Sequence, residues 1–172
     1  MGTSDKLHPE MSVPPIYLFT DGSFEFGRRA PGFGWVAATP DNRVLDQGSG
    51  TVADDGTRTF AGEAGAVLAA LGWAVAAGYR TIYVHTDLES LARHFFRDRE
   101  RGSHYSRRLF AFRQAHPEVE LVVRKVSSAE PLLEKAHHLA RAAMCPVDRD
   151  GVAELPEAIS IARGLEAVPR AA

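Results

Sequence analysis

The order of apolar and polar residues divides the chain into strand-like and helix-like stretches. Apolar, aromatic and β-branched residues begin at Ile16 and end abruptly at Thr20-Asp21-Gly22-Ser23, and a second run from Thr81 ends in the same way at Thr86-Asp87. Such runs are typical of buried strands. Two further strand-like stretches, 32–39 and 43–52, follow the first with short connections, so we expect an antiparallel meander of three strands.

The next part of the chain has helical periodicity. Leu68, Leu71 and Val75 recur at helical spacing within the alanine-rich segment 59–77, and Gly78 is a natural C-terminal stop. We also expect helices at 88–99, 103–114, 132–144 and, as an added amphipathic helix, 156–165, together with a strand at 118–125. A meander followed by alternating helices and strands predicts an α/β fold, a mixed sheet covered by helices.

Composition narrows the class of protein. The 172 residues are 45% hydrophobic and 24% charged, which is typical of one globular domain. The net charge of −2 predicts no bulk attraction to nucleic acid, so any such binding needs a local patch. Cys145 is the single cysteine, which excludes an internal disulfide and a cysteine-rich zinc site. With no unbroken run of about 18 apolar residues and a polar start, we expect a cytoplasmic protein without membrane contact.

Acidic residues follow both strand-like runs at the same point. A carboxylate at the end of a buried strand costs several kcal/mol if it is dry and unpaired, so Asp21 should face a cleft, a cation or a metal. The alternative is that Asp-Gly simply ends the strand with a turn. The second Thr-Asp ending, at Asp87, favours the first interpretation, because two strands can bring their acids to one edge of a sheet. Glu63, in the first turns of the helix at 59–77, is a third candidate.

The order of these motifs closely resembles the ribonuclease H type 1 family over roughly residues 16–143. The matching motifs are Thr20-Asp21-Gly22-Ser23, Pro31-Gly32-Phe33-Gly34-Trp35, Gly62-Glu63-Ala64, Thr86-Asp87, and Glu134-Lys135-Ala136-His137-His138-Leu139-Ala140-Arg141-Ala142-Ala143. The resemblance implies a five-stranded mixed sheet, an antiparallel meander plus parallel strands, flanked by helices. With it, we expect a ribonuclease H-like domain at 15–144, and the residues outside it indicate a disordered leader at 1–14 and a linker with a possible short helix at 145–172.

The same resemblance implies a chemistry. Members of the family hold two divalent ions, Mg²⁺ or Mn²⁺, about 4 Å apart, and cut the RNA strand of RNA–DNA hybrids as endonucleases. By resemblance, Asp21 would bridge both ions, and Glu63 and Asp87 would each complete one side. Carboxylate oxygens are the ligands that Mg²⁺ prefers, and clustered carboxylates repel one another without a metal. We expect a monomer whose partner is an RNA–DNA hybrid.

The fourth metal ligand of the family is usually aspartate, and His137 stands at that position here. An imidazole brings less negative charge and suits transition metals better than Mg²⁺, so we expect a preference for Mn²⁺. The alternative is that His137 is an ordinary solvent-facing helix residue, and we interpret His138 as a bystander. Ser127 replaces the family's mobile loop histidine. Substrate-contacting positions also differ, at Thr59-Phe60 and at Leu88-Glu89.

Nucleic-acid contacts are expected from two places. Gly22 and Ser23 follow the first acid, and a basic set could contact phosphates: Arg93, Arg97, Arg107 and Arg108. The alternative for these arginines is a solvated helix surface. Two other functions stay open: a related nuclease with a different nucleic-acid substrate, and a non-catalytic binding module of the same fold. We expect His85 to be structural, and four aromatic residues to lie in the core: Trp35, Trp73, Phe110 and Phe112.

Overall fold

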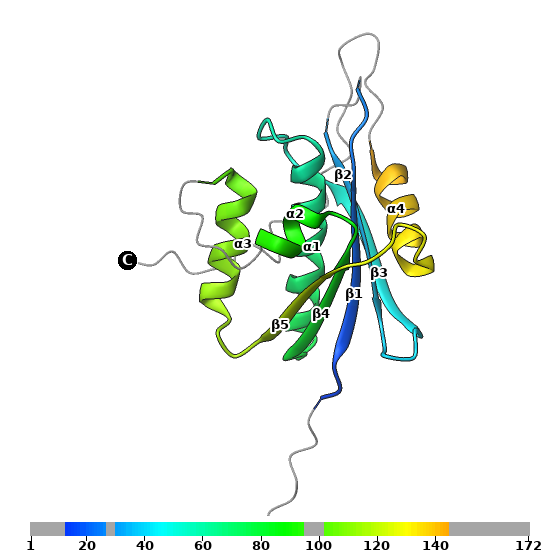
Figure 1. Ribbon diagram of the computed structural model, residues 1–172, viewed down its shortest axis with the longest axis vertical. Coiled ribbons are helices and arrows are strands. Elements are labelled where there is room, and N and C mark those ends of the chain that lie inside the picture. The colour runs from blue at the N-terminus through cyan, green and yellow to red at the C-terminus, as the bar shows by residue number, and fades with distance from the viewer. Residues whose placement is uncertain (1–12, 27–29, 95–101, 145–172) are drawn as a thin grey trace, which may run out of the picture.

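The computed structural model describes residues 13–26, 30–94 and 102–144 (Figure 1). This part of the chain holds five strands and four helices. In chain order they are β1 (Ile16–Ser23), β2 (Gly32–Ala38), β3 (Val44–Thr51), α1 (Thr59–Ala76), β4 (Thr81–Thr86), α2 (Glu89–His94), α3 (His104–Ala115), β5 (Glu120–Lys125) and α4 (Pro131–Ala143). The predicted elements are therefore confirmed wherever the chain is described. The leader up to residue 12 and the segment 145–172, with its predicted helix, lie outside the described residues.

The five strands form one mixed sheet in the order β3-β2-β1-β4-β5. β1 pairs antiparallel with β2, which pairs antiparallel with β3, whereas β4 runs parallel to both β1 and β5. The predicted meander plus parallel strands is thus confirmed. β1 lies at the centre, and β1 and β4, which are parallel neighbours, end at the same edge of the sheet.

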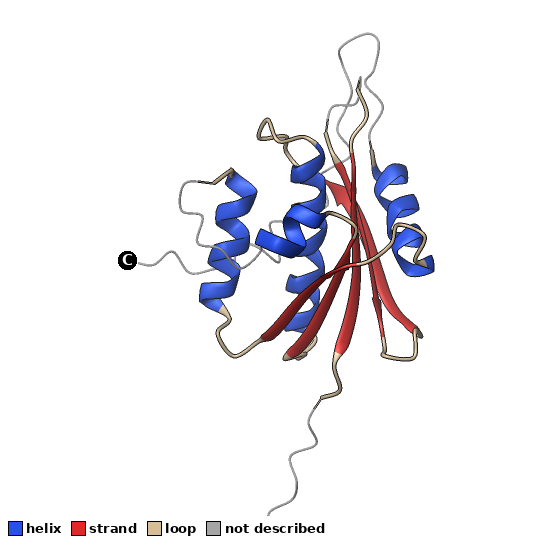
Figure 2. Cartoon of the chain, viewed as in Figure 1, coloured by secondary structure: helices blue, strands red, loops and turns tan. Residues whose placement is uncertain are grey.

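Helices cover both faces of the sheet, with α1, α2 and α3 on one face and α4 on the other (Figures 1 and 2). Successive side chains of a strand point to opposite faces, and β1 follows this rule. Ile16 and Leu18 lie in the buried cluster that α1 covers, and Phe19 lies in a second cluster with Leu133 and Ala136 of α4. The apolar residues of α1 therefore pack in the core layer on one face of the sheet, and α4 covers the core layer on the other face.

Glycine permits close approaches between the helices and the sheet at two positions near Asp21. A Cβ atom at Gly22 of β1 would lie 2.2 Å from the backbone nitrogen of Glu63, and one at Gly34 of β2 would lie 2.2 Å from the backbone oxygen of Ala136. Any side chain at these positions would force α1 or α4 away from the sheet. Both approaches occur beside the strand position that carries Asp21, because Asp21 pairs with Gly34.

Three details refine the sequence predictions. Trp35 and Phe112 are buried, and Trp73 is partly buried against the core, as expected. Phe110 is only half-buried and belongs to neither cluster, because α3 buries Tyr105, Leu109 and Phe112 at helical spacing and leaves position 110 on the flank. The helix expected at 88–99 runs from Glu89 to His94, and residues 95–101 lie outside the described chain.

Helix α1 is apolar on most of its surface. Its length and mean hydropathy of 1.4 would allow it to cross a membrane, although the sequence contains no unbroken apolar run of that length. In the structure 61% of the helix is buried inside the protein, where it packs against β1 and α3. Its composition is therefore explained by its place in the core.

Candidate active site

Three acidic side chains converge at the edge where β1 and β4 end. Asp21 lies near the end of β1, Asp87 directly follows β4, and Glu63 lies in the second turn of α1. One carboxylate oxygen of each lies within 4.8 Å of those of the other two. Asp21 and Glu63 are only 5% and 4% exposed, whereas Asp87 is partly exposed. The structure thus brings together the three acids that the sequence singled out.

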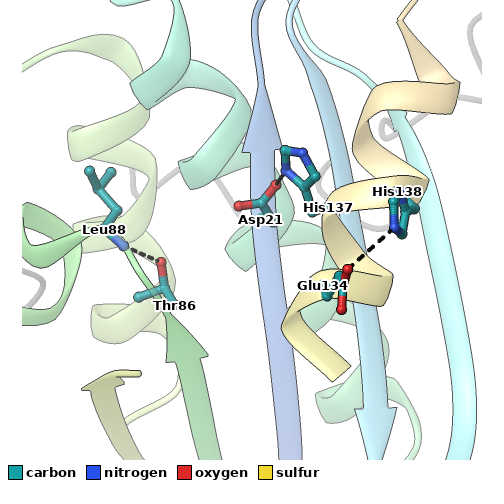
Figure 3. Close-up of polar contacts among 6 residues, drawn as sticks. All are labelled: Asp21, Thr86, Leu88, Glu134, His137 and His138. Atoms are coloured by element: carbon teal, nitrogen blue, oxygen red, sulfur yellow. Dashed lines mark hydrogen bonds and ion pairs between the residues drawn. The ribbon is translucent and has the colours of Figure 1, made fainter. Parts of the chain in front are cut away.

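Buried threonines precede both aspartates. Thr20 and Thr86 are both fully buried, and the Thr20 hydroxyl donates a long hydrogen bond of 3.4 Å to the backbone oxygen of His85 on β4. The Thr86 hydroxyl oxygen accepts a hydrogen bond of 3.1 Å from the backbone N–H of Leu88 (Figure 3). These bonds connect the two parallel strands and fix the turn that carries Asp87. The repeated Thr-Asp ending in the sequence therefore has a structural cause.

The acids strongly affect one another because two of them are buried. Burial raises the pKa of the Glu63 carboxyl well above its usual value of 4.5, and the negative charges of Asp21 and Asp87 raise it further, against a hydrogen bond from the Gly22 backbone. Burial also raises the pKa of Asp21, while the hydrogen bond and the charge of His137 oppose that shift. The site therefore favours either a bound proton or a nearby cation over bare carboxylates.

One oxygen of the site has no partner. Oε2 of Glu63 is buried and accepts no hydrogen bond from any described residue. Buried polar atoms nearly always have partners, so this oxygen indicates a missing group. A hard divalent cation such as Mg²⁺ or Mn²⁺ takes carboxylate oxygens as ligands. The set of Asp21, Glu63 and Asp87 fits such an ion.

His137 contacts the acid cluster through a single member. Its Nδ1 lies 2.8 Å from Oδ2 of Asp21, and its side chain is 45% exposed (Figure 3). It does not belong to the set of mutually close ligand atoms, so its role as a fourth ligand stays a prediction. The close approach of Ala136 to Gly34, the strand partner of Asp21, brings the next residue of α4 within reach of this carboxylate. His138 instead pairs with Glu134, 3.8 Å away on an exposed face.

The residues expected to contact nucleic acid have different environments. Gly22 packs against the backbone of α1, so its place in the sequence motif has a packing reason. Arg107 is exposed on α3 and donates to the backbone oxygen of Gly102 at 3.2 Å, and Arg108 is partly exposed beside it. Arg97 and the side chain of Arg93 lie outside the described residues. A phosphate-binding role for the arginines stays a prediction.

Sequence reasoning missed a cluster next to the acids. In the structure, Phe26 is 79% exposed, and the guanidinium of Arg58 lies over the rings of both Phe24 and Phe26. Two phenylalanines in a polar loop directly after Asp-Gly were the available signal, because an exposed loop offers such residues no core to fill.

The profile of a family described as reverse transcriptase-like matches residues 19–141. RNase H1 from the halophilic archaeon Halobacterium salinarum NRC-1 is 19% identical with a TM-score of 0.61, and the match covers 75% of this chain and 96% of that one. The N-terminal RNase H domain of rv2228c from Mycobacterium tuberculosis is 20% identical with a TM-score of 0.63, covering 76% and 94%.

A third similar structure contains nucleic acid. LC11-RNase H1, solved in complex with an RNA/DNA hybrid, is 19% identical with a TM-score of 0.61, and the match covers 75% of this chain and 96% of that one. No curated protein matches the chain. At these identities the structural likenesses establish the fold, and the family profile covers all three acids.

Proposed function

Because the chain belongs to the reverse transcriptase-like family and has the ribonuclease H fold, we propose that it is a metal-dependent endonuclease that hydrolyses the RNA strand of RNA–DNA hybrids. The observation that carries this proposal is the convergence of Asp21, Glu63 and Asp87, two of them buried, around an unpartnered carboxylate oxygen. Fold alone does not imply function, whereas this arrangement of acids has a specific chemical use.

In this proposal Asp21, Glu63 and Asp87 would hold the divalent ions. Such ions, when bound, activate a water molecule for attack and stabilise the leaving oxygen of a phosphodiester. The protein supplies a fixed set of oxygens: Glu63 is held by the backbone N–H of Gly22, and Asp21 by Nδ1 of His137. Whether His137 acts as a further ligand or only orients Asp21, it limits the rotation of that carboxylate.

The proposed partner is an RNA–DNA hybrid. LC11-RNase H1, which shares the fold, was solved with an RNA/DNA hybrid, and this supports nucleic acid as the substrate class. The 2′-hydroxyl of the cut strand is the group that distinguishes RNA from DNA. With a net charge of −2, the chain must bind such a polyanion through local contacts.

Cleavage of end-labelled substrates tests the proposal. Wild type and Asp21→Asn would be incubated with an RNA–DNA hybrid, single-stranded RNA, duplex RNA and duplex DNA, each with Mg²⁺ or Mn²⁺ or with chelator. Asp46→Asn is the matched control, because Asp46 lies on the exposed strand β3. Circular dichroism would confirm that each variant is folded.

The expected result is cutting of the RNA strand of the hybrid that needs a divalent ion, is lost in Asp21→Asn and is retained in Asp46→Asn. Cutting of another nucleic acid that still depends on Asp21 would preserve the metal site and contradict the hybrid specificity. If folded wild type cuts none of the substrates with either ion, the nuclease proposal fails, and a non-catalytic binding module becomes the better interpretation.

A further inference from the structure

Phe24, Phe26 and Arg58 form a cluster, here called the aromatic–arginine cluster. The guanidinium carbon of Arg58 lies 5.8 Å from the ring centroid of Phe24 and 5.1 Å from that of Phe26. The two rings meet edge to face, with centroids 5.6 Å apart. Contacts of this kind between a cation and aromatic faces are favourable, so the three side chains hold one another in place without a core.

The cluster lies at the rim of the acid site. Phe24 is three residues beyond Asp21, and an extended chain of that length spans at most about 10 Å. Arg58 directly precedes α1, and Glu63 lies four residues beyond the first residue of that helix, which corresponds to about 6 Å along its axis. The cluster therefore lies near enough to the acids for a nucleic acid bound there to extend to it.

The backbone of Arg58 is held in an unfavourable conformation. Its φ of 52° lies in the left-handed region that side chains other than glycine rarely adopt. Oδ1 of Asp54 accepts hydrogen bonds of 2.9 Å from the backbone N–H groups of both Gly56 and Arg58, which maintains this conformation. Strained residues that the surrounding structure holds in place are concentrated at functional sites. Two hydrogen bonds to the Asp54 carboxylate thus hold Arg58 at this position.

The side chains of Arg58 and Phe26 are both open to a ligand. Arg58 is exposed, and none of the ion pairs among the described residues joins it to a carboxylate, so its N–H groups are available to a phosphate. Phe26 is 79% exposed, the highest fraction among the exposed large hydrophobic residues of the described chain. An aromatic ring beside a cation offers a stacking surface for a nucleobase together with a contact for its backbone.

We propose that the aromatic–arginine cluster binds an unpaired nucleotide of the substrate next to the acid site, with its base stacked on Phe26 and a neighbouring phosphate bound by Arg58. The base must be unpaired or terminal, because both faces of a base inside a duplex are covered by its neighbours. This inference rests on the proposed function, and it adds that the preferred substrate carries a single-stranded or frayed segment beside the cut.

Binding measurements test the inference separately from catalysis. All proteins would carry Asp21→Asn so that no probe is cut, and fluorescence anisotropy would compare a blunt RNA–DNA hybrid with the same hybrid extended by a short single-stranded overhang. Phe26→Ala removes the stacking ring, Phe26→Trp restores one, and Arg58→Gln removes the charge. Leu45→Ala and Arg80→Gln are the controls, because both residues are exposed elsewhere on the sheet and its connections.

We expect Phe26→Ala to weaken binding of the overhang probe by about 5- to 100-fold and to leave the blunt hybrid unchanged, while Phe26→Trp restores affinity. Arg58→Gln should reduce the salt dependence of log Kd by about one unit, and neither control should change affinity. If Phe26→Ala changes neither probe, or both equally, the inference is wrong even when wild type cuts hybrids in an Asp21-dependent way. If the parent protein binds neither probe, both the inference and the proposed function are contradicted.

Discussion

Replacing Glu63 with glutamine should stabilise the metal-free protein at neutral and alkaline pH. The Glu63 carboxylate is 4% exposed, its Oε2 has no hydrogen-bond partner among the described residues, and two other carboxylate oxygens lie within 4.8 Å. Glutamine keeps the shape of the side chain, and its amide oxygen can still accept the hydrogen bond from Gly22. Its NH₂ group can donate to the neighbouring aspartates, so the substitution exchanges a repulsion for an attraction.

The size of the effect follows from the geometry. At 4.8 Å and an effective dielectric constant of about 20, two unit charges repel by about 3 kcal/mol, which applies to the buried pair Glu63 and Asp21. Asp87 is partly exposed, so its repulsion with Glu63 lies nearer the value in water, about 1 kcal/mol. We therefore predict a gain of about 2 to 4 kcal/mol in the free energy of unfolding at pH 8, equivalent to roughly 6 to 15 °C in Tm.

The pH dependence has a definite sign. The folded pKa of Glu63 is raised above its unfolded value of 4.5, so the folded state binds the proton more tightly than the unfolded state. The contribution of Glu63 to the stability of wild type without metal is then lost as the pH rises above about 4.5 and through the folded pKa. Glu63→Gln lacks this loss, so the two proteins should differ most at high pH and converge near pH 4.5.

Thermal and urea unfolding in chelator across pH 4.5 to 8.5 provide the measurement, with Glu120→Gln at the exposed start of β5 as the control. Addition of Mn²⁺ or Mg²⁺ should raise the Tm of wild type in a concentration-dependent way and raise that of Glu63→Gln much less. A Glu63→Gln protein that is less stable than wild type at pH 8 in chelator would refute the reasoning. Equal stabilisation of both proteins by the metals would refute the assignment of Glu63 to the ion site.

Four further substitutions test other parts of the structure, each by unfolding measurements. Gly34→Ala should lower the free energy of unfolding by at least about 2 to 3 kcal/mol, because its Cβ would lie 2.2 Å from a backbone oxygen of α4. Gly72→Ala, whose Cβ would have nothing within 4 Å, should instead raise that free energy by about 0.5 to 1 kcal/mol by stabilising α1. The opposite order would contradict the packing. His85→Phe should remove a loss of stability below pH 6.5, because burial and then Arg124 lower the folded pKa of His85, and Nδ1 has no partner; an unchanged pH profile would refute this. His137→Asp should increase stabilisation by Mg²⁺ relative to Mn²⁺, since it replaces an imidazole with a carboxylate, and an unchanged ratio would count against contact with the ion.

Much of the fold could be predicted because local and tertiary requirements agree in this sequence. The apolar run of β1 is buried on both faces, under α1 and α4, so it reads as a continuous hydrophobic stretch, and α1 follows helical spacing along its length. The Thr-Asp endings identified the site for a physical reason. The threonines hold two parallel strands and a turn in place, and the acids follow at a shared edge.

The remaining features depend on distances that residue types do not encode. The contact between His137 and Asp21 requires α4 to approach β2 at Gly34. The sequence does not reveal this approach, because a glycine in a strand is equally consistent with a bulge or a turn. The half-buried position of Phe110 on the flank of α3 depends on which side α1 occupies. The aromatic–arginine cluster joins two loops that lie more than thirty residues apart, and no periodicity marks such a contact.

The position of the acids is tied to close backbone contacts between the helices and the sheet. A Cβ at Gly22 would lie 2.2 Å from the nitrogen of Glu63, so the start of α1 already rests on β1 with no space between them. On the other face, Nδ1 of His137 holds Asp21 at 2.8 Å. The carboxylates therefore cannot relieve their repulsion by a small backbone shift, because packed interiors transmit such shifts at a cost. Only a proton or a cation can relieve it, and at neutral pH a divalent ion supplies the larger charge. Gly22, which lets α1 pack against the sheet, thus also keeps the three carboxylates close enough together to favour a bound cation.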